Sequence, residues 1–214
     1  MFVVIDGVDA SWKTTQMNLL KDYLDNKNLS YDVYDFPQYE KESSFLVKEY
    51  LNWNLWSLEE ITAKQASLLF AVDRFYAKKD ILNSLKDKNF VLSNRYTTSN
   101  IVHQATKLEN EAEQDSIISW IENIEYDILW LPKPDKVIFL DMYIDIAWEL
   151  NKKRGWWVWR DIHELDYNYL RNSYFRAIDI AKKLGWTIIK CYEDDKPRSL
   201  ESIQKDIQKV LWIN

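Results

Sequence analysis

The stretch VIDGVDASWKTTQ, residues 4–16, decides the fold, because it has the features of a phosphate-binding loop between a strand and a helix. Its centre, GVDASWKT (residues 7–14), fits the pattern G-x-x-x-x-G-K-[ST] except that Trp12 stands where glycine is expected. In such a loop backbone N–H groups cradle phosphates, the lysine reaches the β- and γ-phosphates, and the Ser/Thr hydroxyl binds Mg²⁺. The loop also leads into a helix N-terminus, whose dipole favours anions. The sequence therefore predicts a phosphate site with Lys13 as its cation and Thr14 as its metal ligand. The residues expected to contact the phosphates are Gly7, Val8, Asp9, Ala10, Ser11, Trp12, Lys13, Thr14 and Thr15.

Short apolar runs alternate with helical patterns along the rest of the chain. Strands are expected at residues 2–6, 29–36, 90–94, 136–142 and 186–192, and the main helices at 13–27, 58–85, 166–184 and near the end. Ser57 and Glu60 are expected to form a capping box at the start of the second of these helices. This alternation predicts a P-loop NTPase-like α/β fold: a five-stranded parallel sheet with helices on both faces. Ligands of such folds bind at the carboxyl ends of the strands. We expect one domain over residues 1–214, with a short lid at about 153–164.

Composition narrows the classes of protein. The chain has 214 residues, a net charge of −6 with both signs mixed, and one cysteine, Cys191. The mixed charge argues against a nucleic-acid binder. The lack of an eighteen-residue apolar run argues against a membrane protein, and the single cysteine and the lack of a basic leader favour the cytoplasm.

Further motifs resemble one family, thymidylate kinase, over nearly the whole chain. FPQYE (36–40) resembles its Phe-Pro loop, LLFAVDR (68–74) its pocket helix, and SNRYTTSNIVHQ (93–104) its Asp-Arg-Tyr motif and the helix after it. LPKPDKVIFLD (131–141) resembles the approach to the fourth strand, and KRGWWVWRDIHE (153–164) occupies the place of the lid. The resemblance implies an enzyme that transfers the γ-phosphoryl group of ATP to dTMP, with Mg²⁺ as its metal.

The resemblance also implies roles for individual residues. Phe70 would stack on the thymine ring, Arg74 would contact the base or its surroundings, and Gln104 would hydrogen-bond the base edge. Arg95 would bridge the phosphates of donor and acceptor, and Asp9 would hold the sugar 3′-hydroxyl or the metal shell. The expected catalytic residues are Lys13, Arg95, Asp9 and the lid arginines Arg154 and Arg160, and the expected acceptor pocket is Asp9, Phe36, Pro37, Phe70, Arg74, Arg95, Ser99 and Gln104.

The chain departs from the family pattern at three places besides Trp12. Asn94 stands where the family has the Asp of Asp-Arg-Tyr, so a neutral amide replaces a carboxylate expected near the metal. The phosphate-binding arginine often found after Phe-Pro is replaced by Gln38 and Tyr39. No arginine occurs within the phosphate loop either, so the charge of the transferred group would be neutralised mainly by the lid arginines.

The counts of glycine and tryptophan are unusual. The chain has 3 Gly and 11 Trp, whereas typical usage predicts about 15 glycines. Glycine is the residue that the phosphate loop, turns and helix ends favour, and it would suit seven of the tryptophan positions: 12, 53, 56, 130, 156, 157 and 159. We therefore hypothesise that many of these tryptophans are encoded by a stop-type codon. The source organism would read this codon as glycine, whereas the written sequence translates it as tryptophan. Trp120 and Trp186 suit apolar positions, and Trp148 and Trp212 stay unassigned.

Other interpretations stay open. The chain could be a kinase for another (deoxy)nucleotide or nucleoside, because selectivity cannot be read from one sequence. If Trp12 is real, the chain could be a catalytically inactive nucleotide-binding homologue, since an indole there should collide with phosphate or force the loop open. The other tryptophans could likewise be real and pack on the core. The helix at residues 58–85 could supply a homodimer face or simply a monomer's core.

Overall fold

The computed structural model describes residues 1–52, 54, 55, 60–153 and 167–213. The lid expected at about 153–164, with Arg154 and Arg160, therefore lies almost wholly outside the described residues. The same holds for Trp53, Trp56 and the three tryptophans between 156 and 159.

Five parallel strands form the central sheet, in the spatial order β2-β3-β1-β4-β5. They are β1 (Phe2–Gly7), β2 (Tyr31–Asp35), β3 (Phe90–Asn94), β4 (Lys136–Asp141) and β5 (Thr187–Lys190). A short antiparallel pair, β6 (Tyr192–Glu193) and β7 (Lys196–Pro197), follows. Because the strands are parallel and β1 lies between β3 and β4, the loops after β1, β2 and β3 meet at one edge of the sheet.

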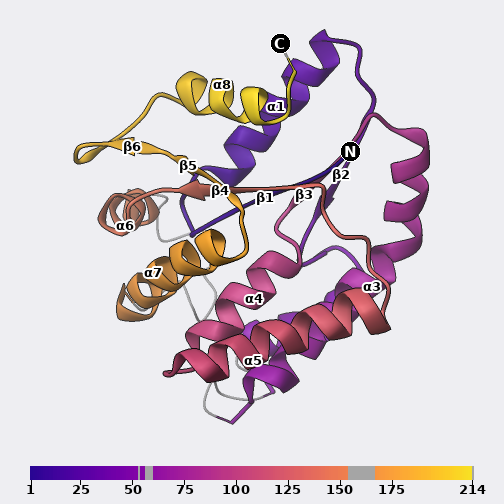
Figure 1. Cartoon of the computed structure of the whole chain (residues 1–214), viewed down its shortest axis with the longest axis vertical. Helices are drawn as coiled ribbons and strands as arrows, with labels where there is room; N and C mark the ends of the chain where they lie inside the picture. The colour runs from indigo at the N-terminus through magenta and orange to yellow at the C-terminus, as the bar shows by residue number, and fades with distance from the viewer. Residues whose placement is uncertain (53, 56–59, 154–166, 214) are drawn as a thin grey trace.

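Helices cover both faces of this sheet (Figure 1). On one face lie α1 (Lys13–Asn26) and α8 (Leu200–Val210). On the other lie α3 (Ala63–Asp87), α4 (Thr97–Thr106), α5 (Glu111–Glu122) and α7 (Tyr167–Lys183). The remaining helical segments are the 3₁₀ turn η1 (Glu42–Ser44), α2 (Phe45–Leu51), the π-helix η2 (Asn123–Ile128) and α6 (Ile144–Lys153).

The central strand shows why this sequence forms a covered sheet. All six residues of β1 are buried, and its side chains alternate between the two faces. Val3 and Ile5 pack with Leu20 of α1, whereas Phe2 and Val4 pack with Ile81 of α3. A strand that is apolar on both faces needs helices on both sides, and the alternation of strands and helices supplies them.

The expected fold class is confirmed, and each expected strand is present. The long helix begins later than expected: it was placed at residues 58–85 but starts at Ala63. Thr62 and Gln65 cap it reciprocally, since each side chain accepts the backbone N–H of the other residue. This capping box satisfies two N–H groups that the first turn would otherwise leave without partners.

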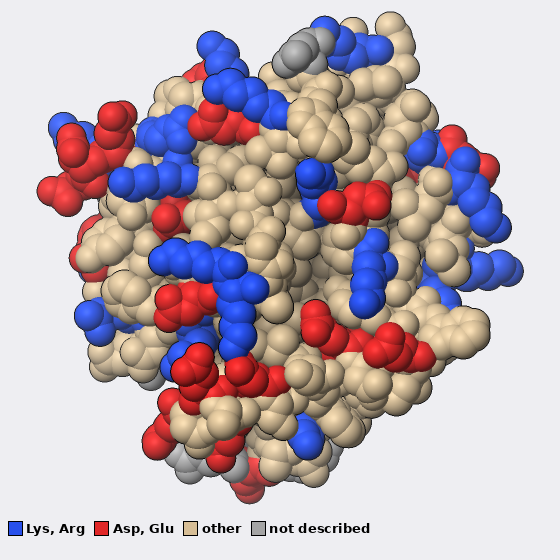
Figure 2. Space-filling model, viewed as in Figure 1, with Lys and Arg blue, Asp and Glu red and all other residues tan. Residues whose placement is uncertain are grey.

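The surface agrees with the mixed charge of the sequence. Basic and acidic side chains are interspersed over the face that Figure 2 shows. Among the described residues, no helix is both long and apolar enough to cross a membrane.

Candidate active site

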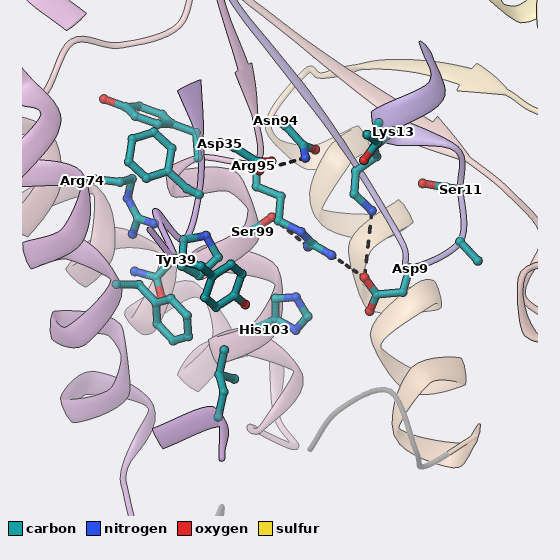
Figure 3. Close-up of a pocket in the computed structure, with 18 of the residues that line it drawn as sticks. Asp9, Ser11, Lys13, Asp35, Tyr39, Arg74, Asn94, Arg95, Ser99 and His103 are labelled. Atoms are coloured by element: carbon teal, nitrogen blue, oxygen red, sulfur yellow. Dashed lines mark hydrogen bonds and ion pairs between the residues drawn. The ribbon is translucent and has the colours of Figure 1, made fainter. Parts of the chain in front are cut away.

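A cavity of about 330 Å³ opens at the carboxyl edge of the sheet, where the loops after β1, β2 and β3 meet. It gathers most of the residues expected to bind nucleotide (Figure 3). Those of the phosphate loop are Asp9, Ala10, Ser11, Trp12, Lys13, Thr14 and Thr15, and those of the expected acceptor pocket are Phe36, Pro37, Phe70, Arg74, Arg95, Ser99 and Gln104. Gly7 and Val8 border a smaller adjoining cavity.

The phosphate loop is closed around its lysine. Lys13 Nζ donates hydrogen bonds to the carbonyl oxygens of Gly7 at 3.0 Å and Val8 at 2.8 Å, and lies 4.0 Å from an Asp9 carboxylate oxygen. A Cβ added at Gly7 would lie 2.7 Å from the carbonyl oxygen of Leu140, so glycine is required there for close packing against β4.

Trp12 does not force the loop open, contrary to one of the two outcomes expected for it. The N–H of Ser11 reaches the Val8 carbonyl at 3.2 Å, and that of Gln16 reaches the Trp12 carbonyl at 2.9 Å. The Trp12 side chain packs against the apolar cluster beneath α1. Its backbone is left-handed, with φ at 65°. The collision of the indole with bound phosphate stays a prediction.

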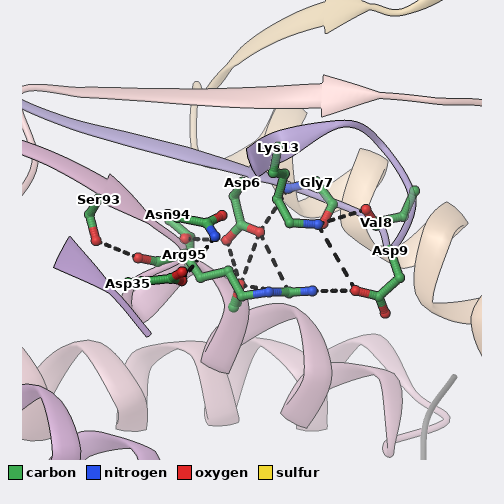
Figure 4. A network of polar contacts seen from close by, with 11 residues as sticks. Asp6, Gly7, Val8, Asp9, Lys13, Asp35, Ser93, Asn94 and Arg95 are labelled. Atoms are coloured by element: carbon green, nitrogen blue, oxygen red, sulfur yellow. Dashed lines mark hydrogen bonds and ion pairs between the residues drawn. The ribbon is translucent and has the colours of Figure 1, made fainter. Parts of the chain in front are cut away.

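Arg95 lies at the centre of the polar network between the loop and the end of β3 (Figure 4). Its guanidinium forms an ion pair with Asp9, donates to Ser99 Oγ at 3.2 Å, and lies 4.0 Å from Asp6. Ser99 in turn donates to the Asp6 carboxylate at 2.8 Å. The arginine expected to bridge the two phosphate positions is therefore held between two carboxylates, with a fifth of its side chain exposed.

At the far end of the cavity Arg74 is held by a residue that the sequence analysis missed. Glu125, fully buried in η2, accepts hydrogen bonds from Arg74 Nε at 2.6 Å and Nη2 at 2.5 Å. Thr97 Oγ1 and Asn100 Nδ2 also donate to Glu125, at 2.6 and 2.9 Å. Burial alone would lower the pKa of Arg74, but the charge and hydrogen bonds of Glu125 raise it on balance. The guanidinium thus stays charged, with Nη1 as the nitrogen that Glu125 does not engage.

Two buried amides line the same end. Gln104 and Asn100 are 1% and 3% exposed, and neither Gln104 Oε1 nor Asn100 Oδ1 accepts a hydrogen bond from the described residues. A buried acceptor without a partner is costly, and a hydrogen-bond donor on a bound ligand would relieve that cost. Gln104 was expected here. Asn100 was missed, although it lies one turn before Gln104 on α4 and therefore on the same face.

The Phe-Pro loop is fastened to α3 through Asp73 in the FAVDR segment. Asp73 is 1% exposed and accepts from the backbone N–H of Gln38 at 2.8 Å and from Ser43 Oγ at 2.5 Å. These bonds hold Phe36 and Pro37 against the pocket helix that carries Phe70. Phe70 lines the cavity and packs edge-on against Tyr50, with ring centroids 6.2 Å apart.

Asn94 faces a carboxylate. Its Nδ2 donates to Asp35 Oδ1 at 2.9 Å, and its own Oδ1 accepts no hydrogen bond from the described residues. Burial raises the pKa of Asp35, partly offset by Arg95, the Asn94 hydrogen bond and Lys13. The amide that replaces the family's aspartate therefore stabilises a neighbouring carboxylate instead of repelling it.

The described residues contain no cluster of three or more His, Cys, Asp or Glu side chains that could hold a metal by themselves. Thr14, whose hydroxyl is expected to bind Mg²⁺, lines the cavity. A metal here would take most of its ligands from phosphate and water, as Mg²⁺ commonly does.

Comparisons with known proteins agree with this geometry. The sequence model of a family described as thymidylate kinase matches residues 5–207. The chain is 30% identical over 210 residues to a probable thymidylate kinase 1 of Saccharolobus solfataricus, covering 98% of each chain. It is 26% identical over 186 residues to a thymidylate kinase of Mycobacterium tuberculosis, covering 86% of this chain and 82% of that one. A solved structure of the thymidylate kinase of Candida albicans superposes with a TM-score of 0.74 at 21% identity, covering 99% of this chain and 90% of that one.

Proposed function

The chain belongs to the thymidylate kinase family, and from that premise we propose how its residues transfer the γ-phosphoryl group of ATP to dTMP. The observation that carries the proposal is the position of Arg95 in a single cavity, between the phosphate loop and the Arg74 end (Figure 3). Phosphoryl transfer requires mainly that two phosphates be positioned and their charge neutralised. A cation held between a donor site and an acceptor site does both.

The phosphate loop would hold the donor. Its N–H groups and the α1 N-terminus would face the ATP phosphates, and Lys13 would exchange its carbonyl partners for phosphate oxygens. The Thr14 hydroxyl fits as one protein ligand of Mg²⁺. The chemistry that Mg²⁺ would supply when bound is neutralisation of the charge of the ATP phosphates.

The other end would hold the thymine base. Phe70 would stack on the ring, while Arg74 and the amides of Asn100 and Gln104 would hydrogen-bond its polar edge. Thymine presents two carbonyl acceptors and one N–H donor, so Arg74 would donate to a carbonyl and one of the two amide oxygens would accept the N–H. Asp9, paired with Lys13 and Arg95, would lie beside the sugar. The assignment of Arg154 and Arg160 to the closing lid stays a prediction.

The test is ADP release with a panel of nucleoside monophosphates, measured on the chain as written and on Trp12→Gly. We expect turnover with dTMP that Trp12→Gly increases, and Lys13→Met in that background should abolish it. If neither protein turned over any monophosphate, the proposal would be contradicted.

Trp12 favours a second candidate for the chain as written, a nucleotide-binding protein without turnover. Titration calorimetry with ATP separates the two. ATP binding by the Trp12 protein without ADP release, together with release by Trp12→Gly, would assign the loss of activity to the indole alone.

A homodimer is the assembly that α3 supports. Leu68, Val72, Phe75 and Tyr76 recur on one face of the helix and are 40–62% exposed. We expect a second copy of the chain to cover this stripe, in the cytoplasm. Sedimentation should show a dimer, and Val72→Glu should shift it to monomer; a wild-type monomer at tens of micromolar would contradict the assembly.

A further inference from the structure

The six described tryptophans fall into two groups by backbone conformation. Trp12, Trp130 and Trp212 have positive φ angles of 65°, 53° and 55°. Trp120, Trp148 and Trp186 do not. The left-handed region brings Cβ close to the following carbonyl oxygen, so glycine occupies it routinely, asparagine sometimes, and large side chains rarely.

Trp212 closes α8 in the same way as two other residues close their helices. The N–H of Ile213 bonds to the Gln208 carbonyl at 3.2 Å and that of Trp212 to the Lys209 carbonyl at 3.1 Å. These two bonds, spanning five residues and three, define the Schellman motif, in which the left-handed residue is usually glycine.

The same pair of bonds ends α7 and α1. After α7 the left-handed residue is Gly185, with bonds from Trp186 to Ala181 at 2.8 Å and from Gly185 to Lys182 at 3.3 Å. After α1 it is Asn28, with bonds from Leu29 and Asn28 of 3.0 Å each. Among the described residues, the two other helix ends with this pair of bonds thus use glycine and asparagine, the residues that the motif favours. The other left-handed residues, Ala10, Arg95 and Asp194, lie in loops outside helix ends.

Trp130 closes η2 in a related cap. The N–H of Leu131 reaches back to the Glu125 carbonyl at 2.9 Å, and the residue between the helix end and Leu131 is left-handed. The Trp130 side chain is 72% exposed and that of Trp212 73%, so neither gains much from burial. Each ring lies near a lysine ammonium: Lys78 Nζ is 5.9 Å from the centre of the Trp130 ring, and Lys136 Nζ is 4.5 Å from that of Trp212.

Trp120 and Trp186 make the contacts that are typical of a half-buried tryptophan side chain. The Trp120 indole N–H donates to Ser67 Oγ at 3.3 Å, and Lys64 lies 4.7 Å above the ring. Trp186 packs beside Phe139, with ring centroids 6.4 Å apart. Both are half-buried against the same apolar cluster.

We propose that the natural protein carries glycine at positions 12, 130 and 212, where a codon that the source organism reads as glycine has been written as tryptophan. At position 12 the proposal also rests on the phosphate-loop function, because glycine there completes the pattern G-x-x-x-x-G-K-T. At positions 130 and 212 it rests on backbone conformation alone. The assignment adds Trp212 to the positions that composition and motifs single out, and it keeps Trp120 and Trp186 as true tryptophans.

The coding DNA tests the proposal without reference to kinase activity. We expect the stop-type codon UGA at 12, 130 and 212, and the ordinary tryptophan codon UGG at 120 and 186. UGG at 12, 130 and 212 would overturn the proposal. UGA at 120 and 186 as well would also overturn it, because the choice of codon would then show no relation to the backbone conformation of the residue.

A matched series of substitutions tests the physical basis in the purified chain. Trp130→Gly and Trp212→Gly should each raise the Tm by about 2–4 °C, because strain at a left-handed residue is removed and little burial is lost. Trp120→Gly and Trp186→Gly are the controls, and both should lower it. If all four lowered the Tm alike, glycine would not be the residue the backbone favours at 130 and 212.

Discussion

Arg74 and Glu125 form a bidentate ion pair in which both side chains are at most 3% exposed. A buried pair of this kind is stable because each charge compensates the other and further hydrogen bonds satisfy the remaining lone pairs. Thr97 and Asn100 supply those bonds to Glu125. The pair therefore fixes the guanidinium of Arg74 at the end of the cavity where we propose that the base binds.

Glu125→Gln should lower the free energy of unfolding by about 3 kcal/mol, because it leaves the charge of Arg74 buried without its partner. Urea denaturation measures this. Since Arg74 would also lose its orientation, KM for dTMP should rise more than kcat falls. Glu149→Gln is the control: its pair with Lys152 is exposed, so it should cost less than about 1 kcal/mol. Equal losses in the two variants would contradict the role given to Glu125.

Gln104→Met should separate stability from substrate binding. It removes a buried acceptor without a protein partner and keeps the volume, so the free energy of unfolding should stay the same or rise by about 1 kcal/mol. If the amide binds the base, KM for dTMP should rise about tenfold or more. A variant with lower stability and unchanged KM would show that Gln104 is a structural residue.

Lys107 should make stability depend on pH. Burial lowers the pKa of Lys107 to about 8 from 10.5, beside the Tyr50 hydroxyl. Between these values the unfolded chain holds more protons, so stability rises with pH, and the cost of burying the charge is complete below about pH 8. At about 1.36 kcal/mol per pKa unit that cost is up to about 3 kcal/mol.

Lys107→Met should therefore be more stable than the wild type at pH 7, by an amount that shrinks toward pH 10. Urea unfolding at the two pH values measures it, with the exposed Lys152→Met as control. If the difference in unfolding free energy between Lys107→Met and the wild type did not change with pH, the titration of Lys107 would contribute nothing to the pH dependence of stability.

Asn94→Asp should place a second carboxylate against Asp35. Two carboxylates at this distance cannot both ionise cheaply, so one pKa rises and the folded state loses about 1–2 kcal/mol at pH 7 in EDTA. The loss should vanish as pH falls and the carboxyls protonate. Asn94→Ala, which adds no charge, should show no such pH dependence. If the difference in unfolding free energy between Asn94→Asp and the wild type were the same at pH 7 and pH 4, the two carboxyl groups would not interact.

The strands and the loop between β1 and α1 were predictable because their signals are local. Apolar runs of five or six residues, each ending at a turn, mark buried parallel strands, and the phosphate loop has its own residue pattern. The start of α3 was misplaced because Ser57 and Glu60 fit the same capping pattern as Thr62 and Gln65, which form the capping box in the structure. Ser57 itself lies outside the described residues.

Glu125 was not predictable, for a different reason. It lies among several acidic residues in IENIEYDIL, and the π-helix that turns it inward departs from the spacing of an α-helix. Its partner Arg74 is 51 residues away in sequence. Such a pairing depends on how α3 and η2 pack, which no local pattern encodes.

The left-handed helix ends carry a practical consequence for making this protein. A large side chain in that conformation costs about 1–2 kcal/mol, so three of them consume about 3–6 kcal/mol of a stability that is commonly 5–15 kcal/mol. A laboratory host that follows the written sequence would synthesise the strained version. Poor yield or aggregation in such a host would then reflect the wrong amino acid at three positions, and a synthetic gene with glycine codons there is the version to express.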